Sequence, residues 1–109
     1  MPSVRDDGSV VTLDLHGATV EEALDITYRT LYLAEERGRQ KVKLIHGSST
    51  SRGGSDRRTI KRELAALVDQ GSLGAHATST MKSRDYIVLA LDVTVPSDPT
   101  RIQPQDVLW

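Results

Sequence analysis

Two short apolar segments, each closed by a His-Gly pair, flank a single helix signal in this chain. The first segment spans residues 10–17 and the second spans residues 41–47. Both are rich in β-branched and aliphatic side chains, which favours strands, and glycine allows a sharp turn where each strand ends. A strand, a helix and a second strand in this order predict a βαβ unit with parallel strands and a right-handed crossover.

Thr19 and Glu22, three residues apart, mark the start of the intervening helix with a capping-box pattern. Gly38 follows the last helical turn and predicts the end of the helix. The side chains expected to face the core recur at helical spacing, namely Val20, Ala23, Leu24, Thr27, Leu31 and Ala34.

The remainder of the chain predicts a second helix and a β-hairpin. A helix is expected from residue 55 or 56 to residue 70, with Ile60, Leu64, Leu67 and Val68 facing inward. Residues 73–80 predict a weak strand and residues 81–85 a turn. Residues 86–93 are almost continuously apolar and predict the clearest strand, antiparallel to the one before it.

These elements predict one α/β domain, a two-layer α+β sandwich of βαβαββ order with a mixed four-stranded sheet and two helices. A length of 109 residues fits a single core. We expect residues 1–9 to be a flexible N-terminus, residues 10–93 to be the folded domain, and residues 94–109 to be an irregular, proline-containing tail. The apolar end of this tail has three open alternatives, which are docking on this chain, docking on a neighbour, or disorder.

Composition excludes several classes of site. The chain has no cysteine, which removes disulfides, thiolate zinc sites and cysteine nucleophiles. No stretch approaches the roughly 20 apolar residues that cross a bilayer, and the N-terminus lacks a signal-peptide pattern. We therefore expect a cytoplasmic protein with no membrane partner. Aromatic residues make up only 4 %, so we expect recognition of shape or backbone rather than stacking on bases.

Charge is distributed unevenly although the net charge is −1. Residues 1–36 carry a balance of −6, residues 37–67 a balance of +7, and the remainder a balance of −2. A basic segment inside a near-neutral chain predicts a face that attracts phosphate. Solvated helix faces would give the same pattern, so charge alone leaves both interpretations open.

The carboxyl ends of the two parallel strands are the expected ligand site. Asp14 and His16 share one face of the first strand, His46 ends the second, and the N-terminus of the second helix should meet the same edge with its free amides. Each residue alone has a structural explanation, such as a histidine bracing a turn. The convergence of sequence-distant groups favours a functional site.

The motifs at this edge resemble those of the Smr family, small domains related to the C-terminal part of MutS2 proteins. The resemblance rests on Leu-Asp-Leu-His-Gly at residues 13–17 and Ile-His-Gly at residues 45–47, with matching element order over residues 10–93. The family usually shows His-Gly-x-Gly, whereas Ser49 takes the place of the second glycine here. That difference favours binding over cleavage.

The resemblance implies a sandwich similar to the C-terminal domain of a bacterial translation initiation factor. It also implies DNA or RNA binding, with endonuclease activity in several members. The candidate catalytic residues are Asp14, His16 and His46. The candidate nucleic-acid-binding residues are Gly17, Gly47, Ser48, Ser49, Arg52, Gly53, Gly54, Arg57, Arg58 and Lys61.

Three functions follow as hypotheses. In the first, His16 and His46 share the proton transfers of phosphodiester cleavage, because imidazole can act as acid or base at neutral pH. A divalent metal held by Asp14 and a histidine is the alternative route, although one carboxylate is few for magnesium. The second function is a non-catalytic nucleic-acid or ribosome-binding module, and the third is a protein-interaction domain that uses the tail. The oligomeric state stays open.

Overall fold

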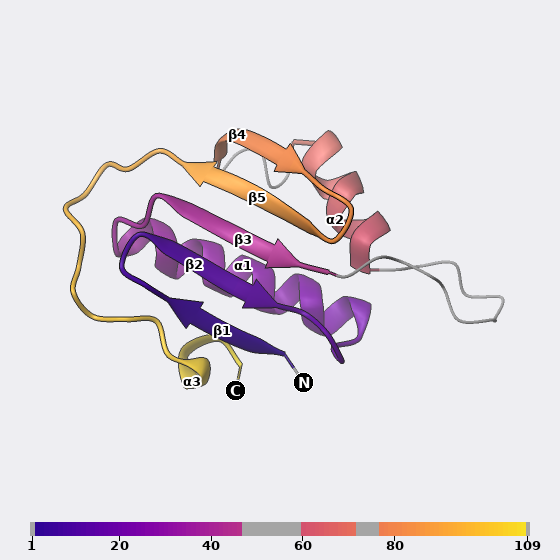
Figure 1. Cartoon of the computed structure of the whole chain (residues 1–109), viewed down its shortest axis with the longest axis horizontal. Helices are drawn as coiled ribbons and strands as arrows, with labels where there is room; N and C mark the ends of the chain where they lie inside the picture. Colours follow the sequence, from indigo (N-terminus) through magenta and orange to yellow (C-terminus); the bar gives the residue numbers. More distant parts are fainter. Residues whose placement is uncertain (1, 47–59, 72–76, 109) are drawn as a thin grey trace, which may run out of the picture.

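The computed structural model describes residues 2–46, 60–71 and 77–108 (Figure 1). The elements in chain order are β1 (Ser3–Asp6), β2 (Val10–Asp14), α1 (Val20–Glu36), β3 (Lys41–Ile45), α2 (Ile60–Asp69), β4 (Ala77–Lys82), β5 (Tyr86–Leu91) and α3 (Pro104–Val107).

The sheet is mixed and has the strand order β1-β2-β3-β5-β4. β2 and β3 are parallel and joined by α1, which confirms the βαβ unit, and β4 and β5 form the expected antiparallel hairpin. The predicted count of four strands and two helices is wrong, because the described residues hold five strands and three helices.

The additional strand is β1, which lies in the segment expected to be flexible. It runs antiparallel to β2, with Ser3 opposite Asp14 and Asp6 opposite Val11. Its sequence, Ser-Val-Arg-Asp, has one apolar residue in four and no strand signal of its own. Pairing with the neighbouring strand β2 and the burial of Asp6 hold this strand, and the burial of Asp6 depends on Arg39, which is 33 positions away.

One face of the sheet packs against the helices, and the other is open. In Figure 1, α1 lies behind β2 and β3. Alternate residues of the central strands point into this layer and are fully or almost fully buried: Val11, Leu13, Val42, Leu44, Ile87 and Leu89. The predicted inward face of α1 is confirmed at Ala23, Thr27, Leu31 and Ala34, each at most 1 % exposed.

The capping box of α1 is confirmed. The backbone N–H of Glu22 donates to Thr19 Oγ1 (3.1 Å), and the N–H of Thr19 donates to Glu22 Oε1 (2.9 Å). The hairpin turn is shorter than predicted. Met81 and Lys82, which were expected in the turn, lie in β4 opposite Val88 and Ile87.

The tail folds back onto the domain instead of remaining irregular. It passes around one end of the sheet to α3, which contacts β1 (Figure 1). Ile102 is 3 % exposed and Val107 is fully buried, so the tail docks on its own chain. These apolar side chains are therefore used inside the fold, which removes them from the hypothesis of a tail-mediated protein interface.

Arg39, which was counted in the basic segment, is fully buried in an ion pair. Its Nε donates to both carboxylate oxygens of Asp6, at 2.8 and 3.0 Å. Its other nitrogens donate to the carbonyl oxygens of Arg37 (2.8 Å) and Thr100 (2.9 Å). Arg39 thus serves the fold, and its charge does not add to a phosphate-attracting face.

Candidate functional site

The carboxyl ends of β2 and β3 lie side by side, as expected. Asp14 is paired with Ile45 across the two strands, and the N–H of Leu15 donates to the carbonyl of Ile45 (2.9 Å). The N–H of His46 donates to the carbonyl of Asp85 (3.0 Å), which ties the end of β3 to the β4–β5 turn. One edge of the sheet therefore brings together three sequence-distant segments.

Asp14 and His16 form a direct pair at this edge. Asp14 Oδ1 lies 2.7 Å from His16 Nδ1 and also accepts the backbone N–H of His16 (2.9 Å). The His16 side chain is 62 % exposed and that of Asp14 is 36 % exposed. A carboxylate is an acceptor only, so this contact places a proton on Nδ1 and leaves Nε2 as the ring nitrogen for a ligand.

Gly17 directs the chain from this pair into α1. Its φ is +86°, a conformation that glycine adopts without steric cost, which confirms its expected role as a turn residue. Thr19 then caps the helix, and Glu21 and Glu22 occupy the first turn. These carboxylates already complement the positive end of the α1 dipole, so this helix start does not favour an added anion.

His46 lies in a different environment from the Asp14–His16 pair. It follows Val42 and Leu44 at two-residue spacing on the covered face of the sheet and is 9 % exposed. Asp14 instead shares the open face with Thr12. The strand ends meet as expected, but one histidine is exposed and the other is buried. The role of His46 as a proton donor stays a prediction.

Most of the predicted binding loop lies outside the described residues. This applies to Gly47, Ser48, Ser49, Arg52, Gly53, Gly54, Arg57 and Arg58. The backbone of Lys61 belongs to α2, but its side chain also lies outside the described set. The assignment of these residues to nucleic-acid binding therefore stays a prediction.

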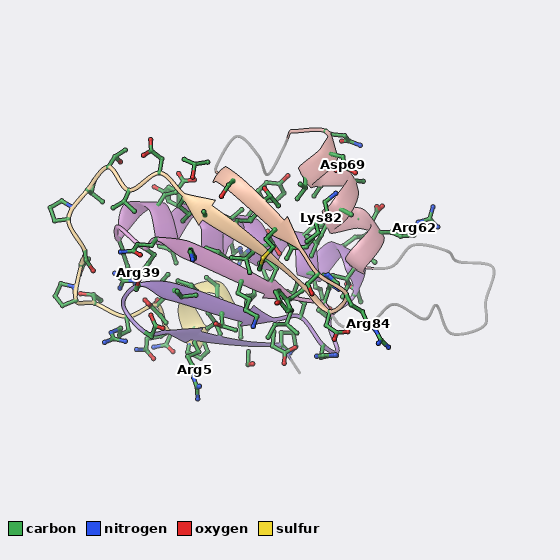
Figure 2. All side chains as sticks on the ribbon, turned by 45° about the horizontal axis from the view of Figure 1, so that its top comes forward. Arg5, Arg39, Arg62, Asp69, Lys82 and Arg84 are labelled. Atoms are coloured by element: carbon green, nitrogen blue, oxygen red, sulfur yellow. The ribbon has the colours of Figure 1, made fainter. Side chains whose placement is uncertain are left out.

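The structure adds basic residues that the motifs do not indicate. Arg5 lies on β1 and Lys43 on β3, and both point to the open face. A depression of about 340 Å³ on this face is lined by Ser3, Val4, Arg5, Thr12, Asp14 and Ile45. Arg84 lies on the β4–β5 turn and is exposed, near the same end of the molecule as Arg62 (Figure 2).

Strand alternation and hairpin register in the sequence could have identified two of these basic residues, Lys43 and Arg84. The alternation of β3 places Lys43 opposite the buried Val42 and Leu44, and the hairpin register places Arg84 beside the end of β3. Arg5 had no such signal, because its strand is visible only through its pairing with β2.

A metal site is not assembled by the described residues. Among them, no group of three or more histidine, aspartate or glutamate side chains is arranged to hold an ion. Asp14 and His16 supply two donor groups, fewer than the six oxygens that magnesium prefers. An ion bound here would need further ligands from the nucleic acid or from outside the described residues.

The sequence matches the Smr domain over residues 13–84, which is more than half of the chain. The chain belongs to the Smr domain family. The match begins in the first motif and spans the helix and strands that build the Asp14–His16 edge. Comparison with the curated proteins gave no significant match, and comparison with the solved structures gave none either.

Membership of the family confirms the resemblance seen in the motifs and supports a nucleic-acid-associated role for this Smr domain. Within the described part of the chain, no helix has both the length and the apolar character that a membrane span needs.

Proposed function

We propose that this Smr domain is an endonuclease that binds nucleic acid across the Asp14–His16 edge and cleaves phosphodiester bonds there. The observation that carries the proposal is the 2.7 Å contact between Asp14 Oδ1 and His16 Nδ1 on an exposed imidazole. A carboxylate behind a histidine orients the ring and stabilises the imidazolium that forms when Nε2 takes a proton.

RNA suits this pair better than DNA, because RNA carries its own nucleophile. His16 Nε2 would remove the proton of a 2′-hydroxyl, and the 2′-oxygen would attack the adjacent phosphorus. The bond to the 5′-oxygen breaks, leaving a 2′,3′-cyclic phosphate on one product. The other product is a 5′-hydroxyl end, whose oxygen takes a proton from water or from an acidic group at the site. This transesterification requires no oxidant and no metal.

The test measures cleavage of a labelled single-stranded RNA and of the matching DNA. We expect RNA products that end in cyclic phosphate, formed equally with and without a chelator. His16→Ala should lower the rate about 100-fold or more, within the range that general acid–base catalysis contributes. Asp14→Asn should also lower it, because the amide loses the charge that stabilises the imidazolium and can donate an N–H to Nδ1, which favours the wrong tautomer of His16.

Arg29→Gln is the matched control, because Arg29 is an exposed residue of α1 that pairs with Asp25 within the helix. It should cleave at the wild-type rate. Equal rates for wild type and His16→Ala would remove the catalytic assignment. His46→Ala should act differently from His16→Ala, by lowering stability, because the His46 side chain is buried.

A non-catalytic nucleic-acid or ribosome-binding module is the second candidate function. The burial of His46 favours it, because the described residues then present only one exposed imidazole at the edge. The absence of the second glycine of His-Gly-x-Gly also favours it. This function predicts salt-dependent binding with no product, unchanged in His16→Ala.

A further inference from the structure

The open face of the sheet carries an excess of positive charge beside the Asp14–His16 pair. Arg5, Lys41 and Lys43 have side chains on this face by strand alternation, and Asp14 is the one acidic residue among the described strand positions there. Asp14 is already engaged by His16. The face is therefore complementary to an anionic partner.

Arg5 and Lys43 lie in one row across the sheet. Arg5 is paired with Thr12 on β2, and Thr12 is paired with Lys43 on β3. Two strand spacings separate the backbone positions of these two residues, about 10 Å. The depression is lined by Arg5 and Thr12 from this row and by Ser3, Asp14 and Ile45 from the next one, so Arg5 and Asp14 border the same depression.

Lys43 is held on the open face by an aromatic ring. Its Nζ lies 4.3 Å from the centre of the Tyr86 ring. Tyr86 is paired with Ile45, and Ile45 with Asp14, so the ring belongs to the row that contains Asp14. Because β2 and β5 flank β3 on opposite sides, the cation–π contact holds the ammonium group on the open face at the β5 side of β3, over the row that contains Asp14.

Apolar side chains share this face with the cations. Val88 continues the Arg5–Lys43 row, and Met81, which is 53 % exposed, ends it on β4. A five-stranded sheet is too wide to enter the major groove of a duplex, which admits a helix or a two-stranded ribbon. Contact between these apolar side chains and bases therefore requires an unpaired strand.

We propose that the open sheet face binds single-stranded nucleic acid, with Arg5 and Lys43 contacting its phosphates and guiding it to His16. This inference deepens the proposed function and rests on it. It names the form of the substrate and two binding residues on β1 and β3 that the family motifs do not contain.

The experiment measures binding of labelled 12-nucleotide single strands and 12-base-pair duplexes, in both RNA and DNA, over a series of salt concentrations. Arg5→Gln/Lys43→Gln should weaken single-strand binding about tenfold or more. In this variant the slope of the logarithm of the binding constant against the logarithm of the salt concentration should be shallower by about 1.4. Each lost phosphate contact on a single strand contributes about 0.7 to that slope. Wild type should prefer single strands to duplexes.

Arg29→Gln/Lys82→Gln is the matched control, because it removes the same net charge from the helix side of the molecule. Lys82 pairs there with Asp69 of α2, well apart from Arg5 (Figure 2). It should change single-strand binding less than threefold. Equal losses in the two double variants, or a preference for duplex, would overturn the inference.

The two proposals fail in different ways. If wild type cleaves RNA and loses cleavage in His16→Ala, but Arg5→Gln/Lys43→Gln binds normally, the endonuclease stands and the open face is not its binding surface. If wild type neither binds nor cleaves any of the probes, the proposed function itself fails.

Discussion

At the scale of single residues, one carboxylate joins its own turn to two distant parts of the chain. Asp6 accepts the N–H of Gly8 (2.8 Å), the N–H of Ile102 (2.8 Å) and the Nε of Arg39. The Asp6 and Arg39 side chains are both fully buried. A buried pair of this kind is costly to break, because removal of one charge leaves the other without compensation.

Asp6→Asn should therefore destabilise the protein by about 3–5 kcal/mol, the usual cost of breaking a buried ion pair. Asp7→Asn is its matched control one position along. Asp7 is exposed, and its pKa is lowered chiefly because its carboxylate accepts the backbone N–H of Val10, then that of Ser9. Its amide keeps an acceptor for these bonds, so the urea midpoint of Asp7→Asn should stay much closer to that of wild type than the midpoint of Asp6→Asn does. Urea unfolding of both variants tests the contrast, and similar midpoints would contradict it.

At the scale of elements, the end of α1 is shaped by the tail that crosses it. Gly38 adopts φ +71°, and a Cβ added there would lie 2.7 Å from the carbonyl oxygens of Val95 and Pro96. The Asp98 N–H donates to the Arg37 carbonyl (3.0 Å). Glycine is thus required twice at this position, once for the left-handed backbone and once for the close approach of the tail.

Gly38→Ala should lower the free energy of unfolding by about 2–4 kcal/mol, since about 1–2 kcal/mol of left-handed strain adds to the overlap with the tail. Gly71→Ala separates these causes. Gly71 has φ +84° after α2, and among the described residues no atom beyond its own chain neighbours lies within 4 Å of an added Cβ. It should therefore cost only the strain, about 1–2 kcal/mol. Thermal unfolding compares the two, and an equal loss would mean that the tail does not press on Gly38.

Elements with local signals were predictable from the sequence, and those that depend on distant partners were not. The capping box at Thr19 and the alternation of β2 and β3 need only neighbouring residues, so these elements and the Asp14–His16 face were predicted correctly. β1 and the path of the tail depend on the Asp6–Arg39 pair, which joins residues 33 positions apart. The burial of His46 was within reach, because it follows Leu44 in the same alternation.

At the scale of the whole molecule, the tail closes one side of the core while the opposite sheet face stays open. Ile102 and Val107 enter the same cluster of buried residues as the strands and α1. The proline-containing segment that precedes them passes over the end of the sheet to reach β1 (Figure 1). The chain thereby covers the β1 side with its own residues and leaves the Arg5–Lys43 face accessible.

If the tail completes the core of its own molecule, Ile102→Ala should cost about 2–4 kcal/mol, as large-to-small changes in cores do. Val95→Ala removes apolar volume from the same tail at a position that is 38 % exposed, so it should cost less than about 1 kcal/mol. Neither variant should change the molecular mass measured by light scattering over a range of protein concentrations. A mass that falls in Ile102→Ala but not in Val95→Ala would show that the tail holds a second copy of the chain instead.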